Sequence, residues 1–125
     1  MEVRHPDTGD LILQDDGRPV TIRLAGADST HFQRIARHNL NRRLKAQRSG
    51  RRMANEITAE DLDRERLEQL VGCTLAWEGI AVDNETVECT PENARNVYTR
   101  FRWLREAAED FQTDRSNFLK ASPKN

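Results

Sequence analysis

The sequence lacks the features that mark many membrane and secreted proteins. No stretch approaches the roughly 18 consecutive apolar residues of a membrane-spanning helix. The first six residues, Met1 to Pro6, do not carry the apolar run of a signal peptide. The two cysteines, Cys73 and Cys89, form no C-x-x-C pair and have no histidine at metal-binding spacing. We therefore expect a cytoplasmic protein whose cysteines are reduced.

Motifs of catalysis are missing as well. The 6 glycines are scattered, so they form no phosphate-binding loop, and neither H-E-x-x-H nor G-x-S-x-G occurs. His31 and His38 are too far apart on one helix to share a metal without a third element, and we interpret them as surface histidines. The acidic residues between 61 and 68 are typical of a solvated helix face. We expect no enzymatic activity, no cofactor and no bound metal.

What the chain does contain is enough apolar residues for one modest core. It has 125 residues, of which 36% are hydrophobic and 33% are charged. This length and composition predict a single folded domain and exclude wholesale disorder. The 20 basic and 21 acidic residues give a net charge of −1. Nucleic-acid or membrane binding would therefore depend on local clusters of charge.

Residues 9–26 predict a β-hairpin. The apolar run Leu11–Leu13 is followed by a turn containing Asp16-Gly17, and then by the run Val20–Leu24, in which apolar and polar residues alternate. Asp-Gly favours a tight turn because glycine adopts positive φ without steric cost. The apolar face of such a hairpin must rest on another element.

The residues after the hairpin predict an amphipathic helix that begins near the cap residues 28–30 and runs to about Arg48. Helical periodicity gathers apolar side chains on one half of this helix, namely Phe32, Ile35, Ala36, Leu40 and Leu44. The opposite side is basic and carries Arg34, Arg37, Lys45 and Arg48.

This cationic segment has more than one interpretation. Between Gln33 and Asn55 there are eight Lys and Arg residues and no acidic residue. We favour the interpretation that the basic face meets solvent or protein, including the acidic helix that follows. The alternatives are an acidic protein partner and a nucleic-acid backbone, for which residues 34–52 would supply the cations.

Three more helical segments are predicted. A helix capped near Thr58 should run to about Trp77 as the most buried helix, with Gly79 just beyond its end. After a connection with a turn at Asp83-Asn84, Thr90 and Pro91 begin the next helix. A single unbroken helix would expose Trp103, so we favour a break near Thr99 and Arg100. A last short element covers residues 115–119.

We therefore predict a mainly α (α+β) fold, a small helical domain of four to five helices with an N-terminal β-hairpin. Residues 1–27 form the hairpin segment, residues 28–120 the helical domain and residues 121–125 a flexible tail.

Short motifs in the second half resemble a known family. The chain has Trp77-Glu78-Gly79, then the helix start containing Pro91, Glu92 and Asn93, and finally Asn117 before Phe118 and Leu119. In this order, over about residues 20–120, they resemble the tail assembly chaperones of long-tailed bacteriophages, encoded just ahead of the tape measure protein.

The resemblance implies a role in virion assembly without catalysis. Such chaperones bind and solubilise the helical tape measure protein in the host cytoplasm, help recruit tail tube subunits, and are generally absent from the finished particle. Their genes often also encode a longer, frameshifted form. The partners implied are the tape measure protein, the tail tube protein and further copies of the chain, with no membrane and no nucleic acid. A structural virion protein (connector or tail completion) and a small nucleic-acid-binding protein are the alternatives.

Candidate residues follow from the family resemblance and from the helical patterns. The family motif positions are Trp77, Gly79, Pro91, Glu92, Asn93, Phe118 and Leu119; we interpret Trp77 first as a core residue. The candidate partner-binding residues are the cations Arg34, Arg37, Lys45 and Arg48 and the aromatic anchors Trp103 and Phe118.

Overall fold

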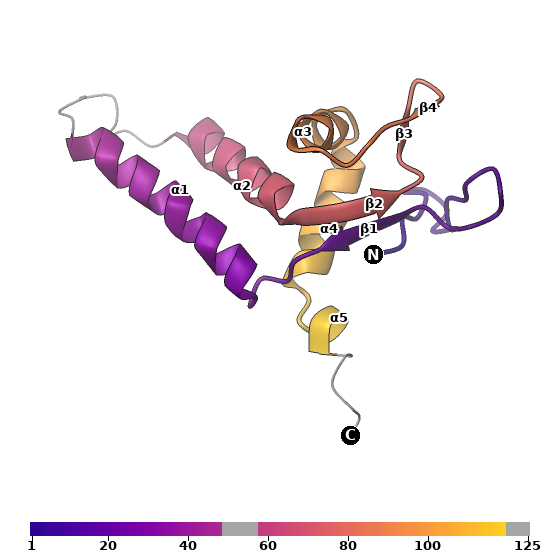
Figure 1. Cartoon of the computed structure of the whole chain (residues 1–125), viewed down its shortest axis with the longest axis horizontal. Coiled ribbons are helices and arrows are strands. Elements are labelled where there is room, and N and C mark those ends of the chain that lie inside the picture. The colour runs from indigo at the N-terminus through magenta and orange to yellow at the C-terminus, as the bar shows by residue number, and fades with distance from the viewer. Residues whose placement is uncertain (49–57, 120–125) are drawn as a thin grey trace.

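Helices make up most of the chain that this computed structural model describes, which is residues 1–48 and 58–119 without the side chains of 46–48 and 119. The described helices are α1 (Thr30–Arg48), α2 (Ala59–Cys73), α3 (Pro91–Arg100), α4 (Arg102–Thr113) and the single turn α5 (Ser116–Leu119) (Figure 1). The strands are β1 (Thr21–Leu24), β2 (Thr74–Glu78), β3 (Ala81–Val82) and β4 (Glu85–Thr86). The predicted fold class, a small and mainly helical α+β domain, is confirmed.

The N-terminal residues fold back on themselves around the predicted Asp-Gly turn. Gly17 has a φ of 87°, and the Val20 N–H donates to the Ile12 carbonyl, so the two predicted runs lie side by side. Val3 also joins them, because its N–H donates to Val20 and its carbonyl accepts from Ile12. The first run consequently forms isolated bridges instead of a continuous strand.

The main partner of β1 is β2, which comes from a distant part of the sequence. The two strands pair antiparallel, with Ile22 opposite Trp77. The prediction that the second helix runs to Trp77 is therefore wrong, since α2 ends at Cys73. The ladder with β1 supplies backbone partners to residues 74–78, where threonine and tryptophan also favour a strand. Gly79, with a φ of 82°, ends this strand and not a helix.

The predicted helix starts are confirmed by their cap bonds. The Ser29 hydroxyl accepts from the Phe32 N–H at 3.0 Å at the start of α1. Thr58 and Asp61 form a reciprocal capping box before α2, and Thr90 caps α3. Each cap satisfies N–H groups that have no partner within their own helix.

The predicted break and the predicted turn are also confirmed. The chain leaves helical geometry at Phe101, where φ is −113° and ψ is 78°, so α3 and α4 are separate helices. Trp103 is half-buried as a result. Asp83 and Asn84 have φ values of 53° and 69°, the conformation of a two-residue turn between β3 and β4.

The buried core lies between β1, the C-terminal half of α2, α3 and α4. It contains Val3, Val20, Ile22, Leu24, Leu70, Val71, Ile80, Ala94, Val97, Tyr98, Leu104 and Ala108. None of these residues belongs to α1, which runs along α2 at the edge of the molecule (Figure 1). The expectation that the second helix is the most buried is wrong, because α2 has three buried residues among its 15 and α4 has four among its 12. Leu62, in the first half of α2, is 46% exposed.

Candidate functional site: a groove between α1 and α2

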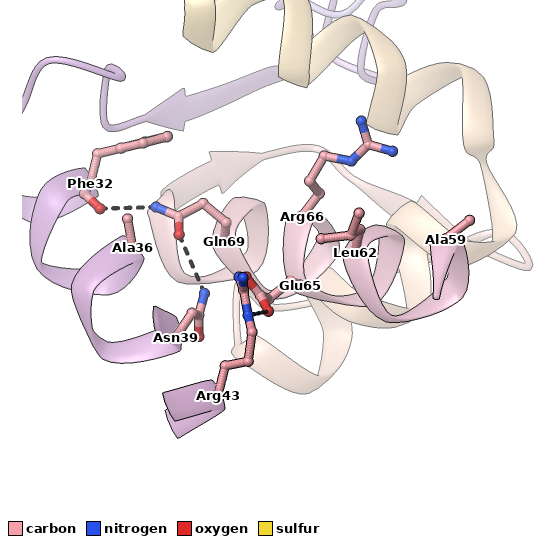
Figure 2. Close-up of a pocket in the computed structure, with 9 residues that line it drawn as sticks. All are labelled: Phe32, Ala36, Asn39, Arg43, Ala59, Leu62, Glu65, Arg66 and Gln69. Carbon is pink, nitrogen blue, oxygen red and sulfur yellow. Dashed lines mark hydrogen bonds and ion pairs between the residues drawn. The ribbon is translucent and has the colours of Figure 1, made fainter. Parts of the chain in front are cut away.

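A groove with a volume of about 550 Å³ runs between α1 and α2. Its lining combines small and apolar side chains with polar ones, and Figure 2 shows them as sticks: Phe32, Ala36, Asn39 and Arg43 from α1, and Ala59, Leu62, Glu65, Arg66 and Gln69 from α2. The two helices come together here because each is amphipathic and turns its more apolar face toward the other.

Polar side chains fix the spacing of the two helices. The Gln69 amide donates to the Phe32 carbonyl at 2.9 Å, and the Asn39 amide donates to the Gln69 side-chain oxygen at 3.3 Å. Further along, the Arg43 guanidinium holds Glu65 through two hydrogen bonds, one of them 3.1 Å long (Figure 2). These hydrogen bonds satisfy the polar side chains that line the groove. The spacing of the two helices, and with it the groove, is therefore fixed by contacts within the chain.

Among the described residues, large apolar side chains in and beside this groove are exposed. Leu62 lines it, and on α1 the row Phe32, Ala36, Leu40 and Leu44 follows at intervals of four residues. Such a row is inclined to the helix axis and drifts from the groove toward solvent. Leu40 and Leu44 are 45% and 39% exposed. The predicted apolar half of this helix is therefore only partly covered by α2.

The basic face of α1 lies on the side away from α2. Ile35, Asn39 and Arg43 meet α2, which places Arg34, Arg37 and Lys45 on the opposite side by helical geometry. All three are exposed, and none forms an ion pair with another described side chain. The side chain of Arg48 lies outside the described residues.

The acidic residues of α2 have partners elsewhere. Arg95 of α3 holds Glu68 through bonds of 2.6 and 2.8 Å, which lowers the pKa of that carboxyl. Arg105 of α4 holds Asp63. Within the described part of the chain, Arg43 is the only arginine of α1 that pairs with an acidic residue of α2. The interpretation that the basic face meets the acidic helix is therefore wrong for Arg34, Arg37 and Lys45.

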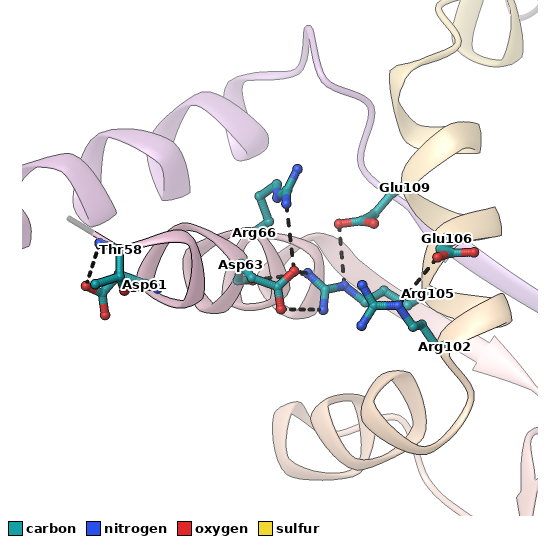
Figure 3. Close-up of polar contacts among 8 residues, drawn as sticks. All are labelled: Thr58, Asp61, Asp63, Arg66, Arg102, Arg105, Glu106 and Glu109. Atoms are coloured by element: carbon teal, nitrogen blue, oxygen red, sulfur yellow. Dashed lines mark hydrogen bonds and ion pairs between the residues drawn. The ribbon is translucent and has the colours of Figure 1, made fainter.

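Arg105 joins α4 to α2 from a buried position. Its side chain is 8% exposed, and its guanidinium donates to both carboxylate oxygens of Asp63 at 3.0 and 3.2 Å (Figure 3). These bonds hold the pKa of Asp63 below its usual value. Glu109 lies 3.6 Å from the same guanidinium, while Arg66 approaches Asp63 only at 3.7 Å from the surface. The partly exposed carboxylate of Asp63 is thus held mainly by the buried guanidinium of Arg105.

The motif residues at the end of β2 have structural contacts. The half-buried Trp77 indole donates to the Val87 carbonyl at 2.9 Å and packs against the core. A Cβ atom at Gly79 would lie 2.5 Å from Cγ of Gln14, so glycine also permits a close approach there. Neither residue lines the α1–α2 groove.

The motif at the start of α3 is a helix cap. Pro91 is the first helical residue and Glu92 lies exposed in the first turn. The Asn93 side chain donates to the Glu88 carbonyl at 2.9 Å and so ties the helix start to the preceding loop.

The two aromatic anchor candidates are half-buried away from the groove. Phe118 stacks edge-on against Phe111, with ring centroids 5.6 Å apart, and covers Gly26. Trp103 packs edge-on against Phe101 and lines a second cavity of about 680 Å³ beside the N-terminal segment and the β3–β4 turn. The side chain of Leu119 lies outside the described residues.

The remaining candidates for chemistry are not clustered. Burial raises the pKa of the Cys73 and Cys89 thiols, and neither forms a disulfide. The His31 ring lies 2.7 Å from the Gly72 carbonyl, and His38 is exposed. In residues 1–48 and 58–119, no three His, Cys, Asp or Glu side chains come together as metal ligands. No helix in these same ranges is long and apolar enough to cross a bilayer.

The basic face of α1 is evident from the sequence, whereas the groove on the other side of this helix is not predicted from it. Asn39 and Gln69 carried a usable signal, because each places an amide within a largely apolar helix face, where it needs a hydrogen-bonding partner from another element. Comparison of the chain with protein-family models, with curated proteins and with solved structures finds no match.

Proposed function

We propose that this chain is a tail assembly chaperone of a long-tailed bacteriophage. It binds the tape measure protein in the host cytoplasm, keeps it soluble and helps recruit tail tube subunits, without making or breaking a covalent bond. The order of the motifs at Trp77, Pro91 and Phe118 supports this family assignment. The single structural observation that supports it is the uncovered apolar surface along the α1–α2 groove.

That surface suits a protein that covers another chain's helices. Exposed leucines beside a preformed groove favour association with an apolar helix face, because burial removes both surfaces from water. A long helical partner offers many such segments, so many copies of a small protein can bind along it, and self-association between copies strengthens each contact.

Coexpression with the tape measure protein of the same phage tests the proposal. We expect the tape measure protein to move from the insoluble to the soluble fraction and to copurify with the chain. Expression of the tape measure protein alone is the control. An unchanged insoluble fraction in the presence of well-expressed, folded chain contradicts the proposal.

The proposal also predicts where the protein is found at the end of assembly. Mass spectrometry of purified particles should detect the tail tube and tape measure proteins but not this chain. Detection at stoichiometric amounts would instead support a structural virion protein.

A further inference from the structure

We infer that the α1–α2 groove binds an amphipathic helix of the partner protein in which acidic side chains flank the apolar stripe. This inference rests on the proposed function and deepens it, because it names the binding surface and the chemistry of the bound segment. It combines the apolar groove of Figure 2 with two exposed arginines, Arg66 in the groove lining and Arg37 beside the Leu40 and Leu44 row.

The groove favours a helix over an extended strand. Its walls are the side chains of two helices whose backbone groups bond within each helix, so it offers no free strand edge. A segment bound there must satisfy its own backbone hydrogen bonds, as a helix does. The 19 residues of α1 span about 28 Å, enough to support several turns of a third helix.

The charges around the groove determine which side chains of the bound helix can lie on either side of its apolar stripe. On α1, Arg37 lies one turn before Leu40 and two turns before Leu44, on the side of the row that faces solvent. On α2, Arg66 lines the groove with 71% of its side chain exposed, and its 3.7 Å neighbour Asp63 is already held by Arg105. Arg66 in the groove lining and Arg37 beside the leucine row therefore present cations, which attract acidic and repel basic side chains.

A second copy of the chain fits this surface less well. The apolar faces of α3 and α4 are buried in the core through residues such as Val97, Tyr98, Leu104 and Ala108. The exposed leucines on described helices are Leu62 in the groove and Leu40 and Leu44 beside it, and cations flank them. Two such faces would repel each other, so the observations favour a different protein as the occupant.

Two synthetic helical peptides test the inference on the full chain. Both are about 18 residues long and share one leucine stripe, but one has glutamate and the other lysine on each side of it. We expect fluorescence anisotropy to show the glutamate peptide binding about tenfold more tightly at low salt, with the difference shrinking as salt is added. Equal affinities, or tighter binding of the lysine peptide, would overturn the inference.

Matched variants locate the binding surface. Leu62 in the groove and Leu75 on β2 are 46% and 45% exposed, so Leu62→Gln and Leu75→Gln remove similar exposed surface at different places. We expect Leu62→Gln in the groove, and Leu40→Gln in the leucine row beside it, to weaken binding of the glutamate peptide about tenfold. Leu75→Gln should leave it unchanged, and the opposite order would contradict the assignment.

A charge reversal tests the basic flank. Arg37→Glu should remove the preference for the glutamate peptide, whereas Arg23→Glu, at an exposed arginine of β1, should retain it. Salt-sensitive binding of duplex DNA that displaces the glutamate peptide and is lost in Arg37→Glu would overturn the inference in favour of nucleic acid. So would concentration-dependent dimers that Leu62→Gln dissociates, because a second copy would then occupy the groove.

The failure of this inference is distinguishable from failure of the proposed function. If Leu62→Gln and Arg37→Glu still solubilise the tape measure protein as well as the unmodified chain does, the groove is not the binding surface and the chaperone function stands. If the glutamate peptide binds as expected but the unmodified chain never solubilises the tape measure protein, the proposed function fails instead.

Discussion

Tyr98 shows how one buried polar group is accommodated in this core. The residue is 1% exposed, and its hydroxyl lies 2.8 Å from the hydroxyl of Thr74. Thr74 in turn bonds to the Leu70 carbonyl. Burial raises the pKa of Tyr98 to about 12, because the phenolate would lose its hydration.

The titration of Tyr98 can be followed directly, because the chain contains 1 tyrosine. Absorbance of the phenolate should rise with a midpoint near pH 12 in the folded protein and near pH 10 in denaturant. Between these values the unfolded chain loses the proton and the folded chain keeps it, so stability falls as pH rises. The loss should reach about 2–3 kcal/mol at pH 12.

Tyr98→Phe is the matched control for this prediction. It removes the phenolate signal. It should also remove the fall in the free energy of unfolding that Tyr98 causes, as urea unfolding at several pH values between 9 and 12 would show. A phenolate midpoint near 10 in the folded protein would show that Tyr98 is accessible to solvent.

The short helix α5 is held by the Phe118 ring, which packs on Phe111 and Gly26, and by the Asn117 amide, which donates to the Phe111 carbonyl at 3.0 Å. A Cβ atom placed on the buried Gly26 would lie 2.8 Å from Cγ of Phe118. Gly26→Ala should therefore displace Phe118 from Phe111 and cost about 1–2 kcal/mol, similar to Phe118→Ala, since both remove the same half-buried packing. The double variant should cost little more than either single one. Chemical denaturation of the three variants measures their free energies of unfolding. A double variant whose loss equals the sum of the two single losses would contradict the prediction.

Two arginines one turn apart on α4 have very different surroundings. Arg105 is buried and bonds to Asp63 of α2, whereas Arg102 is 73% exposed and pairs with Glu106 at 3.5 Å (Figure 3). Removing one partner of an ion pair with a buried member lowers the free energy of unfolding, whereas an exposed ion pair contributes little to it.

Arg105→Ala should therefore lower the free energy of unfolding by about 1–3 kcal/mol, because it removes a buried and packed side chain, whereas the partly exposed Asp63 can be hydrated instead. Arg102→Ala should change it by about 0.5 kcal/mol or less. Urea denaturation compares the two variants. Equal effects would show that the α2–α4 ion pair is not a structural joint.

The core draws on residues from both ends of the described chain. Val3, Val20 and Ile22 pack with Leu70 of α2 and Val97 of α3. The β1–β2 ladder also crosses between the N-terminal segment and the helical part. Removing the N-terminal segment would expose apolar surface of the helices and leave β2 unpaired.

A fragment of residues 28–119 should therefore fail to unfold cooperatively. We expect it to lose near-UV circular dichroism and a sharp thermal transition, while the full chain unfolds in one transition. Differential scanning calorimetry of both proteins makes the comparison. A sharp transition of the fragment would show that the helices fold without the N-terminal segment.

The sequence by itself determined the features whose causes lie within a few residues. The caps at Thr58 and Thr90, the turns at Gly17 and Asp83, and the break after Arg100 each depend on local side-chain chemistry or backbone preference, and each is observed. The basic character of the outer side of α1 also follows from helical spacing alone.

Only the tertiary structure decided which faces are covered and which charges are paired. Residues 74–78 become a strand because β1 lies beside them, although their apolar spacing also fits a helix. Leu40 and Leu62 are exposed because α1 packs on α2 and no described element covers their outer sides. Asp63 pairs with Arg105, from a helix far along the chain, and not with α1. These outcomes depend on contacts between distant segments, for which local sequence carries little information.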